Sequence, residues 1–114
     1  MGLVNRSAVL VRPREPYLQW AKQDDTTGIA ETVFQNMRSV PTTYLILEDE
    51  DGEDARDLIR SSWRAVFEAM LEGWVIVPEM WPPNRTWKMF KEWFEIEISE
   101  CVYDLVMGET IGEI

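Results

Sequence analysis

Residues 42–72, TTYLILEDEDGEDARDLIRSSWRAVFEAMLE, join the clearest strand signal in the chain to the clearest helix signal. The first part, Thr42–Glu48, is rich in β-branched, aromatic and aliphatic residues, and its continuous apolar run predicts a strand covered on both faces. From Ala55 onward, apolar residues recur at three- and four-residue steps, which predicts one amphipathic helix over about Glu53–Glu72. The acidic residues before it suit the positive end of a helix, and Gly73 suits a left-handed C-cap. A strand followed by a long helix indicates a layered core of both elements.

The stretch before this core contains one strand, one short helix and one ambiguous segment. Asn5–Arg12 predicts a strand that ends at Pro13, because proline has no N–H to donate to a ladder. Pro16 opens a short helix, since proline is favoured in the first turn. Residues 29–41 fit an irregular or partly helical segment by spacing, although Thr32–Phe34 also suits a short strand.

The stretch after the core predicts a short helix and a final strand. Asn84 is a candidate N-cap for the helix. Glu95–Val106 predicts a strand whose apolar residues change parity near Ser99 and Glu100, which indicates a β-bulge or a break into two strands. We expect the tail over 107–114 to be loose.

The length of 114 residues favours a single domain spanning residues 1–114. We predict an α+β fold, with a small mixed sheet of three or four strands covered by one long helix and one or two short ones. If Thr32–Met37 is a strand, the order of elements becomes the ferredoxin-like one, in which the first and last strands pair antiparallel. Arg6 and Arg12 would then face Glu95, Glu97 or Glu100 across the ladder.

The composition disfavours several classes of function. The chain has no His and a single Cys, which excludes His-dependent catalysis, His-ligated zinc and an internal disulfide. The lone Cys101 fits a small buried residue in a reducing, cytoplasmic compartment. The net charge of −10 disfavours nucleic acids and anionic membranes, since Arg6, Arg12 and Arg14 form the only local basic cluster in the sequence. No apolar run reaches the ~20 residues of a membrane span, and no glycine-rich phosphate loop is present, so we expect no membrane and no cofactor.

Two groups of carboxylates are candidates for chemistry. The acidic run 48–54 could bind a hard cation, but it does not follow the spacing of an EF-hand loop. A solvated loop at the helix N-terminus is the favoured interpretation, and cation binding stays open. The last strand carries Glu95, Glu97, Glu100 and Asp104, which fit the wet face of a sheet better than an acid–base pair. We therefore assign no catalytic residue and no metal ligand.

Tryptophan is the most informative residue type, with six in the chain. Trp74 and Trp81 lie among prolines and outside the helical stripe, so their rings either cap the core or meet a partner. The candidate interaction surface comprises Trp74, Trp81, Arg85 and Trp87, with Glu50 and Asp51 at its rim. Arg85 also has a simpler explanation, a hydrogen bond to a carbonyl or a pair with a nearby Glu.

Two motifs, supported by a third stretch, carry a resemblance. The opening Asn5-Arg6-Ser7-Ala8, followed by an apolar strand, and the block Trp81-Pro82-Pro83-Asn84-Arg85, leading to Phe90 and Trp93-Phe94, resemble a family of small bacterial proteins of unknown function. The strand entry over Pro41–Glu48 is similar as well, and together these stretches cover about half the chain. The resemblance implies a bacterial cytoplasmic protein with all its elements in one domain, and it transfers no catalytic residues.

These observations favour a non-catalytic, acidic protein–protein interaction module or a small homodimeric subunit, not an enzyme. One alternative is an inhibitor of the immunity-protein type that binds a basic partner through electrostatic attraction. A second alternative is a metal-dependent enzyme that uses carboxylates alone.

Overall fold

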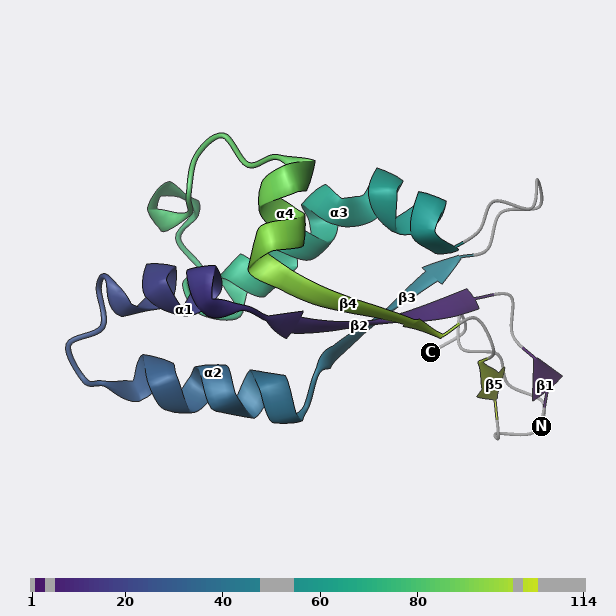
Figure 1. The fold of residues 1–114 in the computed structure, drawn as a ribbon, viewed down its shortest axis with the longest axis horizontal. Helices are drawn as coiled ribbons and strands as arrows, with labels where there is room; N and C mark the ends of the chain where they lie inside the picture. The colour runs from purple at the N-terminus through teal and green to yellow at the C-terminus, as the bar shows by residue number, and fades with distance from the viewer. Residues whose placement is uncertain (1, 4–5, 48–54, 100–101, 105–114) are drawn as a thin grey trace.

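The computed structural model describes residues 2–3, 6–47, 55–99 and 102–104, and its core is a three-stranded antiparallel sheet (Figure 1). The strand β2 (Arg6–Pro13) lies between β3 (Thr42–Leu47) and β4 (Phe94–Ser99). The helices are α1 (Glu15–Lys22), α2 (Ile29–Ser39), α3 (Ala55–Glu72) and α4 (Trp87–Trp93), with a short 3₁₀ turn η1 (Pro78–Met80) before α4. The predicted α+β class is confirmed, but the sheet is antiparallel rather than mixed, because both outer strands run against β2.

The ambiguous stretch 29–41 is helical, so the ferredoxin-like alternative is wrong. Both carboxylate oxygens of Asp25 bind the start of α2, with Oδ2 accepting from the Ala30 N–H at 2.9 Å and Oδ1 from the Gly28 N–H at 3.2 Å. Gly28 has a φ of 78°, a left-handed conformation that glycine adopts without strain. This cap, together with the burial of Ala30 and Phe34 one turn apart, favours helix over the β propensity of the segment.

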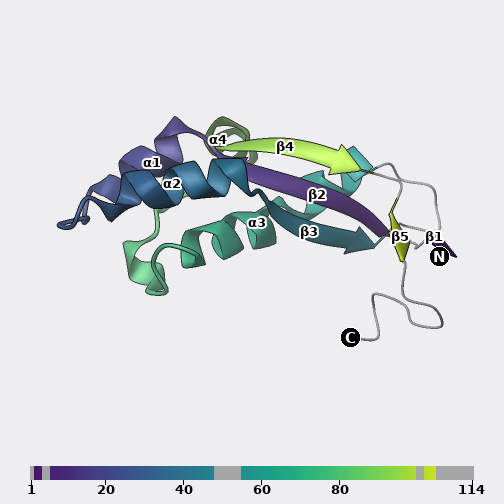
Figure 2. The same cartoon turned by 90° about the horizontal axis from the view of Figure 1, so that it is seen from below.

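The two faces of the sheet differ in their cover. Val9 and Val11 of β2 have no exposed surface and belong to the same core cluster as the buried residues of α3. On the opposite face of β3, Thr43 is exposed and Leu45 is 43% exposed, so the prediction that this strand is covered on both faces is wrong. The reason is that this face has no second layer over β3: Figure 2 shows α2 at one end of it and no helix in front of β3.

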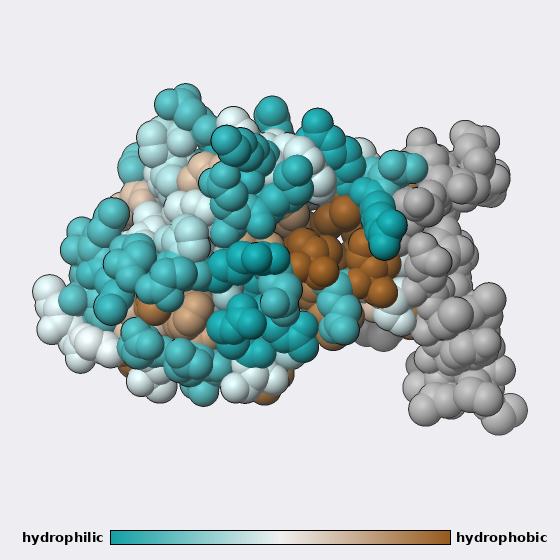
Figure 3. Space-filling view, viewed as in Figure 1, coloured by the Kyte–Doolittle hydropathy of each residue, from teal (hydrophilic) through white to brown (hydrophobic). Residues whose placement is uncertain are grey.

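The predicted long helix is confirmed as α3, which ends at Glu72 as expected. It lays its apolar stripe over the sheet, and the fully buried Phe67 is at its centre. The Phe67 ring lies 5.2 Å from that of Phe94 and 5.5 Å from that of Trp93, between ring centroids. Figure 3 shows apolar surface between α3 and β4, and β4 contributes the partly buried Ile96 and Ile98 to the core.

Two predicted helix caps are wrong. Gly73 is not left-handed, and its N–H donates to the Ala69 carbonyl at 3.2 Å as in a continuing helix. Asn84 does not cap α4, because it lies in the preceding loop with a φ of 56°, a conformation that Asn tolerates. The N-cap is Thr86, whose hydroxyl accepts from the Met89 N–H at 3.1 Å.

The final strand is broken in two, as one of the two predictions for it stated. After β4 ends at Ser99, a separate strand β5 (Tyr103–Asp104) pairs antiparallel with β1 (Gly2–Leu3). The predicted loose tail over 107–114 lies outside the described residues, as does Cys101.

Candidate functional site

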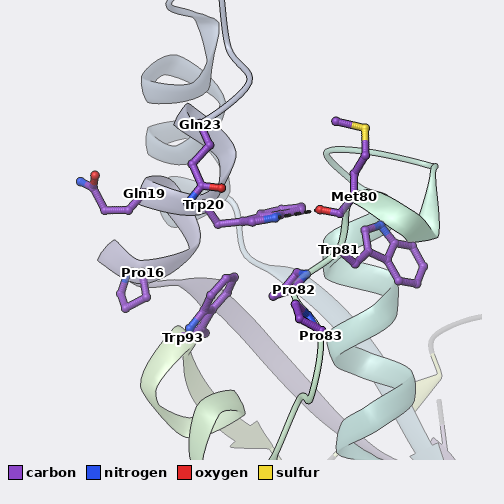
Figure 4. Close-up of a pocket in the computed structure, with 9 residues that line it drawn as sticks. All are labelled: Pro16, Gln19, Trp20, Gln23, Met80, Trp81, Pro82, Pro83 and Trp93. Carbon is purple, nitrogen blue, oxygen red and sulfur yellow. Dashed lines mark hydrogen bonds between the residues drawn. The ribbon is translucent and has the colours of Figure 1, made fainter.

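An open groove of about 480 Å³ lies between α1, the loop that contains η1, and the end of α4 (Figure 4). We call it the tryptophan–proline groove, because three indole rings and three proline rings line it. Its lining residues are Pro16, Gln19, Trp20, Gln23, Met80, Trp81, Pro82, Pro83 and Trp93. These residues come from segments that are far apart in the sequence, from Pro16 to Trp93.

The first wall of the groove is the outer face of α1. Tyr17, Leu18 and Ala21 are buried against the rest of the protein, which leaves Trp20 and its polar neighbours facing outward. The Trp20 indole N–H donates to the Met80 carbonyl at 3.2 Å and ties this wall to the opposite one (Figure 4). The Trp20 ring is therefore attached to α1 and hydrogen bonded to the opposite wall.

The second wall is the loop over residues 74–83, which hydrogen bonds to itself. The Trp81 indole N–H donates to the Val75 carbonyl at 2.7 Å, and the Trp81 backbone N–H donates to the Pro78 carbonyl at 3.1 Å. Proline restricts φ at three positions of this loop and lowers the entropy that ordering it costs. The wall is thus preorganised.

The floor of the groove is an aromatic layer that continues into the core. The ring centroids of Trp20 and Trp93 are 6.1 Å apart with planes tilted by 46°, and Tyr17 lies beneath both, at 5.4 Å from Trp20 and 6.5 Å from Trp93. The Tyr17 hydroxyl donates to the Met70 carbonyl at 2.8 Å, and burial raises the pKa of this hydroxyl far above its ordinary value. Tyr17 is therefore a neutral structural donor.

The chemistry of the groove favours binding rather than catalysis. None of its nine lining residues has a carboxylate, amine, thiol or aliphatic hydroxyl group. Among the described residues, the Trp93 indole N–H has no hydrogen-bond acceptor, and it is the one indole donor of the groove that is not already engaged. The groove offers flat apolar surface, the indole donor of Trp93 and the side-chain amides of Gln19 and Gln23.

The structure separates the predicted interaction residues. Trp81 lines the groove, whereas Trp74 is partly buried against the core. Trp87 stacks on Phe90 at 5.7 Å on another part of the surface. Glu50 and Asp51 lie outside the described residues, so their predicted place at a rim stays a prediction.

Arg85 has the simpler role that the sequence allowed. Its guanidinium donates to the Pro82 carbonyl at 2.9 Å and pairs with Glu68 at 3.1 Å, so both parts of the alternative are confirmed. It also lies 5.7 Å from the Trp81 ring, a cation–π distance. Arg85 therefore supports Trp81 from outside the groove.

Sequence reasoning missed Trp20, Trp93 and Pro16 as parts of a site. Trp20 and Trp93 belong to helices whose apolar spacing predicts core packing, so their partial exposure carries no sequence signal. The one feature of the sequence that could have pointed to this site is Pro16, a further proline beside an aromatic pair, although it lies far from Pro82 and Pro83 in the sequence.

Sequence reasoning also missed a basic cluster on α3 and α4. Arg60 lies 4.7 Å from the Trp87 ring and Lys91 lies 5.5 Å from it, while Arg64 and Arg85 line a small hollow of about 200 Å³. Within the described ranges, no carboxylate pairs with Arg60, Arg64 or Lys91. The acidic charge of the chain is therefore not uniform over its surface.

The strand carboxylates are engaged in ion pairs on the open face of the sheet. Arg12 lies 3.7 Å from Glu95 and 3.4 Å from Glu97, and Arg38 lies 3.6 Å from Glu95. The expected pairing of Arg12 with these residues across the ladder is confirmed. Glu100 lies outside the described residues.

The described part of the chain contains neither a cluster of metal ligands nor a membrane-spanning helix. Within it, no three His, Cys, Asp or Glu side chains gather closely enough to hold a metal ion, and the acidic run 48–54 lies outside it. None of its helices combines the length and the apolar character that crossing a bilayer requires.

No protein-family model, curated protein or solved structure matches the chain. This result is consistent with a family of unknown function, and the resemblance carried by the two motifs stays a prediction.

Proposed function

We propose that this protein is a non-catalytic protein–protein interaction module and that the tryptophan–proline groove is its docking site. The observation that carries the proposal is the groove itself, in which Trp20, Trp81 and Trp93 line an open concave surface without a nucleophile or an acid–base pair. Tryptophan is enriched at the energetic centres of interfaces, because its ring brings a large rigid area with a single polar atom.

Exposed apolar side chains beside the groove support the same function. Ile76 is 78% exposed, Val77 is 44% exposed and Met80 is 42% exposed, and all three belong to the loop that forms the second wall. Exposed apolar side chains at or next to a groove are typical of interaction sites. A partner that fills the groove would also cover part of this loop and bury that surface.

The net charge of −10 favours a basic partner. This feature also supports the inhibitor alternative, in which the target is a basic protein. In both cases, association should weaken as salt is added, because salt screens exposed charges more than a Debye length of about 8 Å apart at physiological ionic strength.

A random-peptide phage display selection on the immobilised full chain tests the groove directly. The blocking variant carries Met80→Lys and Gln23→Lys, which place long charged side chains at two exposed lining positions. The matched control carries Thr32→Lys and Gln35→Lys, which add the same charge at exposed positions of α2 outside the groove. We expect selected peptides to bind the wild type and the control and to lose binding to the blocking variant. Peptides that bind all three proteins equally, or a selection without enrichment, would contradict the proposal.

Homodimerisation is the other form of the interaction proposal, and the open face of the sheet favours it. Leu45 on this face is 43% exposed and Val40, between α2 and β3, is 76% exposed, so a second copy could cover them. Light scattering would then report about twice the chain mass of 13.4 kDa. The Val40→Lys and Leu45→Lys variant should be monomeric in that case, whereas a monomeric wild type at high concentration would refute the dimer.

A further inference from the structure

We propose that the partner segment of the tryptophan–proline groove is a proline-rich peptide in the left-handed polyproline II conformation, flanked by Lys or Arg. This inference rests on the proposed function, because it names the class of ligand for the same site. Three independent properties of the groove support it: the shape of its aromatic surface, the kind of hydrogen-bonding group that is free, and the charges beside it.

The shape of the groove suits proline rings. A polyproline II helix has three residues per turn and rises about 3.1 Å per residue, so every third side chain lies on the same side, about 9 Å apart. Trp20 and Trp93 form an angled pair of rings with a tilt of 46°, and Trp81 lies across from them (Figure 4). Flat pyrrolidine rings pack against aromatic faces of this kind, which is how proline-rich segments are recognised in aromatic-lined grooves.

The free polar groups of the groove include the donors that a polyproline II ligand requires, namely the Trp93 indole N–H and the Gln23 side-chain amide, which can also accept. Proline has no backbone N–H, and the polyproline II helix leaves its carbonyl groups without internal partners. The indole donors of Trp20 and Trp81 are already bonded to carbonyl groups, while the indole N–H of Trp93 has no acceptor among the described residues. An α-helical ligand would satisfy its own carbonyl groups and leave this donor unused.

The charges beside the groove favour basic flanks. Glu15 lies next to the lining residue Gln19, and the Gln19 side-chain amide donates to the Glu15 carboxylate at 2.7 Å. Glu79 is exposed and immediately precedes Met80 in the second wall. Among the neighbouring cations, Lys22 pairs with Glu31 and Arg85 pairs with Glu68, which leaves Arg14 before Glu15. Glu15 and Glu79 have no ion pair among the described residues, so they would attract Lys or Arg beside the proline run.

The test is a titration of the full chain with a blocked oligoproline peptide that has arginine at both ends, followed by NMR of the six indole N–H resonances. We expect the resonances of Trp20, Trp81 and Trp93 to shift together, while those of Trp63 and Trp87 stay in place. Replacing the prolines by glycine and serine should abolish the shifts, because this peptide keeps the charge and loses the preformed helix. Replacing the arginines by glutamate should weaken binding about tenfold, as expected for exposed charge pairs.

Two conservative variants on the same helix separate the donor from general folding effects. Trp93→Phe retains an aromatic ring against Tyr17 and Phe67 but removes the free N–H, so calorimetry should show about fivefold weaker peptide binding. Trp87→Phe makes the same chemical change outside the groove and should leave the affinity unchanged. Equal affinities for both variants would overturn the role of the Trp93 donor.

The outcome also separates this inference from the proposed function. If phage display yields groove-dependent peptides without proline and the oligoproline peptide causes no shifts, the ligand class is wrong while the docking site stands. If display yields no groove-dependent peptide, the proposed function fails as well. Binding that is indifferent to the sign of the flanking charges would overturn the basic flanks.

Discussion

Tyr17→Phe is the substitution that best tests how the groove is built. Tyr17 is 1% exposed, and its hydroxyl donates to the Met70 carbonyl at 2.8 Å, near the C-terminal end of α3. The Trp74 N–H, which a continuing helix would aim at this carbonyl, donates to the Leu71 carbonyl at 3.0 Å instead. The Tyr17 hydroxyl therefore takes the place of a helical hydrogen bond and joins α1 to α3 beneath the groove.

The expected loss follows from the buried acceptor that the variant leaves behind. An unsatisfied buried carbonyl costs about 1–3 kcal/mol, so we expect the free energy of unfolding to fall by about 2 kcal/mol. For a domain of this size, 1 kcal/mol corresponds to about 4 °C, which predicts a decrease in Tm of about 8 °C. The aromatic contacts with Trp20 and Trp93 should survive, because the ring is unchanged.

Urea and thermal unfolding measure the effect, and Tyr44→Phe is the matched control. Tyr44 is also partly buried against the core, but its hydroxyl has no hydrogen bond among the described residues. Removing that hydroxyl should change stability by less than about 0.5 kcal/mol. Equal losses in the two variants would show that hydroxyl deletion in general, and not the Met70 contact, determines the result.

The same residue gives the chain a defined response to alkaline pH. Burial raises the pKa of Tyr17 above its ordinary value of 10.0, and the nearby Tyr44 raises it further. Since the folded state favours the protonated hydroxyl, its contribution is complete below pH 10 and declines as the pH rises above that value. Stability should therefore fall above pH 10 in the wild type and fall less steeply in Tyr17→Phe.

Three further substitutions test the core and the helix ends. Phe67→Ala should lower the free energy of unfolding by about 3–5 kcal/mol in urea denaturation, and Glu68→Ala by no more than about 0.5 kcal/mol; similar losses would mean that the buried face of α3 is misplaced. Gly28→Ala should cost about 1–2 kcal/mol, because its φ of 78° is left-handed, and more than Gly73→Ala, so the reverse order in thermal unfolding would contradict the assigned caps. Asp25→Ala should destabilise the chain above pH 3.8, the ordinary pKa of this carboxyl, because hydrogen bonds from the Ala30 N–H and its neighbours lower that pKa in the folded state. In curves of stability against pH, the effect should vanish as the pH falls below the lowered pKa. An effect that persists at lower pH would exclude the charge of Asp25 as its cause.

Periodic local patterns made most of the fold predictable. The spacing of apolar residues predicted α3, and the parity change near Ser99 predicted a bulge or a break, of which the structure has the break between β4 and β5. The stretch 29–41 was not resolved by pattern, because Thr32–Phe34 suits both states. Its helical state depends on the hydrogen bonds from the start of α2 to the Asp25 side chain, which a sequence pattern does not display.

The groove was only partly predictable, for a different reason. Trp81 stood out because prolines surround it, and it does line the groove. Trp20 and Trp93 carry the same helical spacing as core residues, and their exposure depends on where α1 ends against the loop over 74–83. That relation is tertiary, and it is set by two long-range hydrogen bonds, from Tyr17 to Met70 and from Trp20 to Met80.

The distribution of charge explains why the composition alone misjudges the surface. The net charge of −10 suggests an acidic exterior, yet Arg60, Arg64, Arg85 and Lys91 gather on α3 and at α4, and within the described part of the chain only Arg85 of these four has an ion pair, with Glu68. A charge acts mainly within a Debye length of about 8 Å at physiological ionic strength, so a bound partner responds to its nearest groups rather than to the net value. A ligand in the groove therefore meets Glu15 and Glu79, whereas a ligand on the opposite side of Arg85 would meet cations. The two surfaces adjoin where Arg85 lies against Trp81. One protein of acidic composition therefore has a surface that favours basic ligands next to a surface that favours acidic ones.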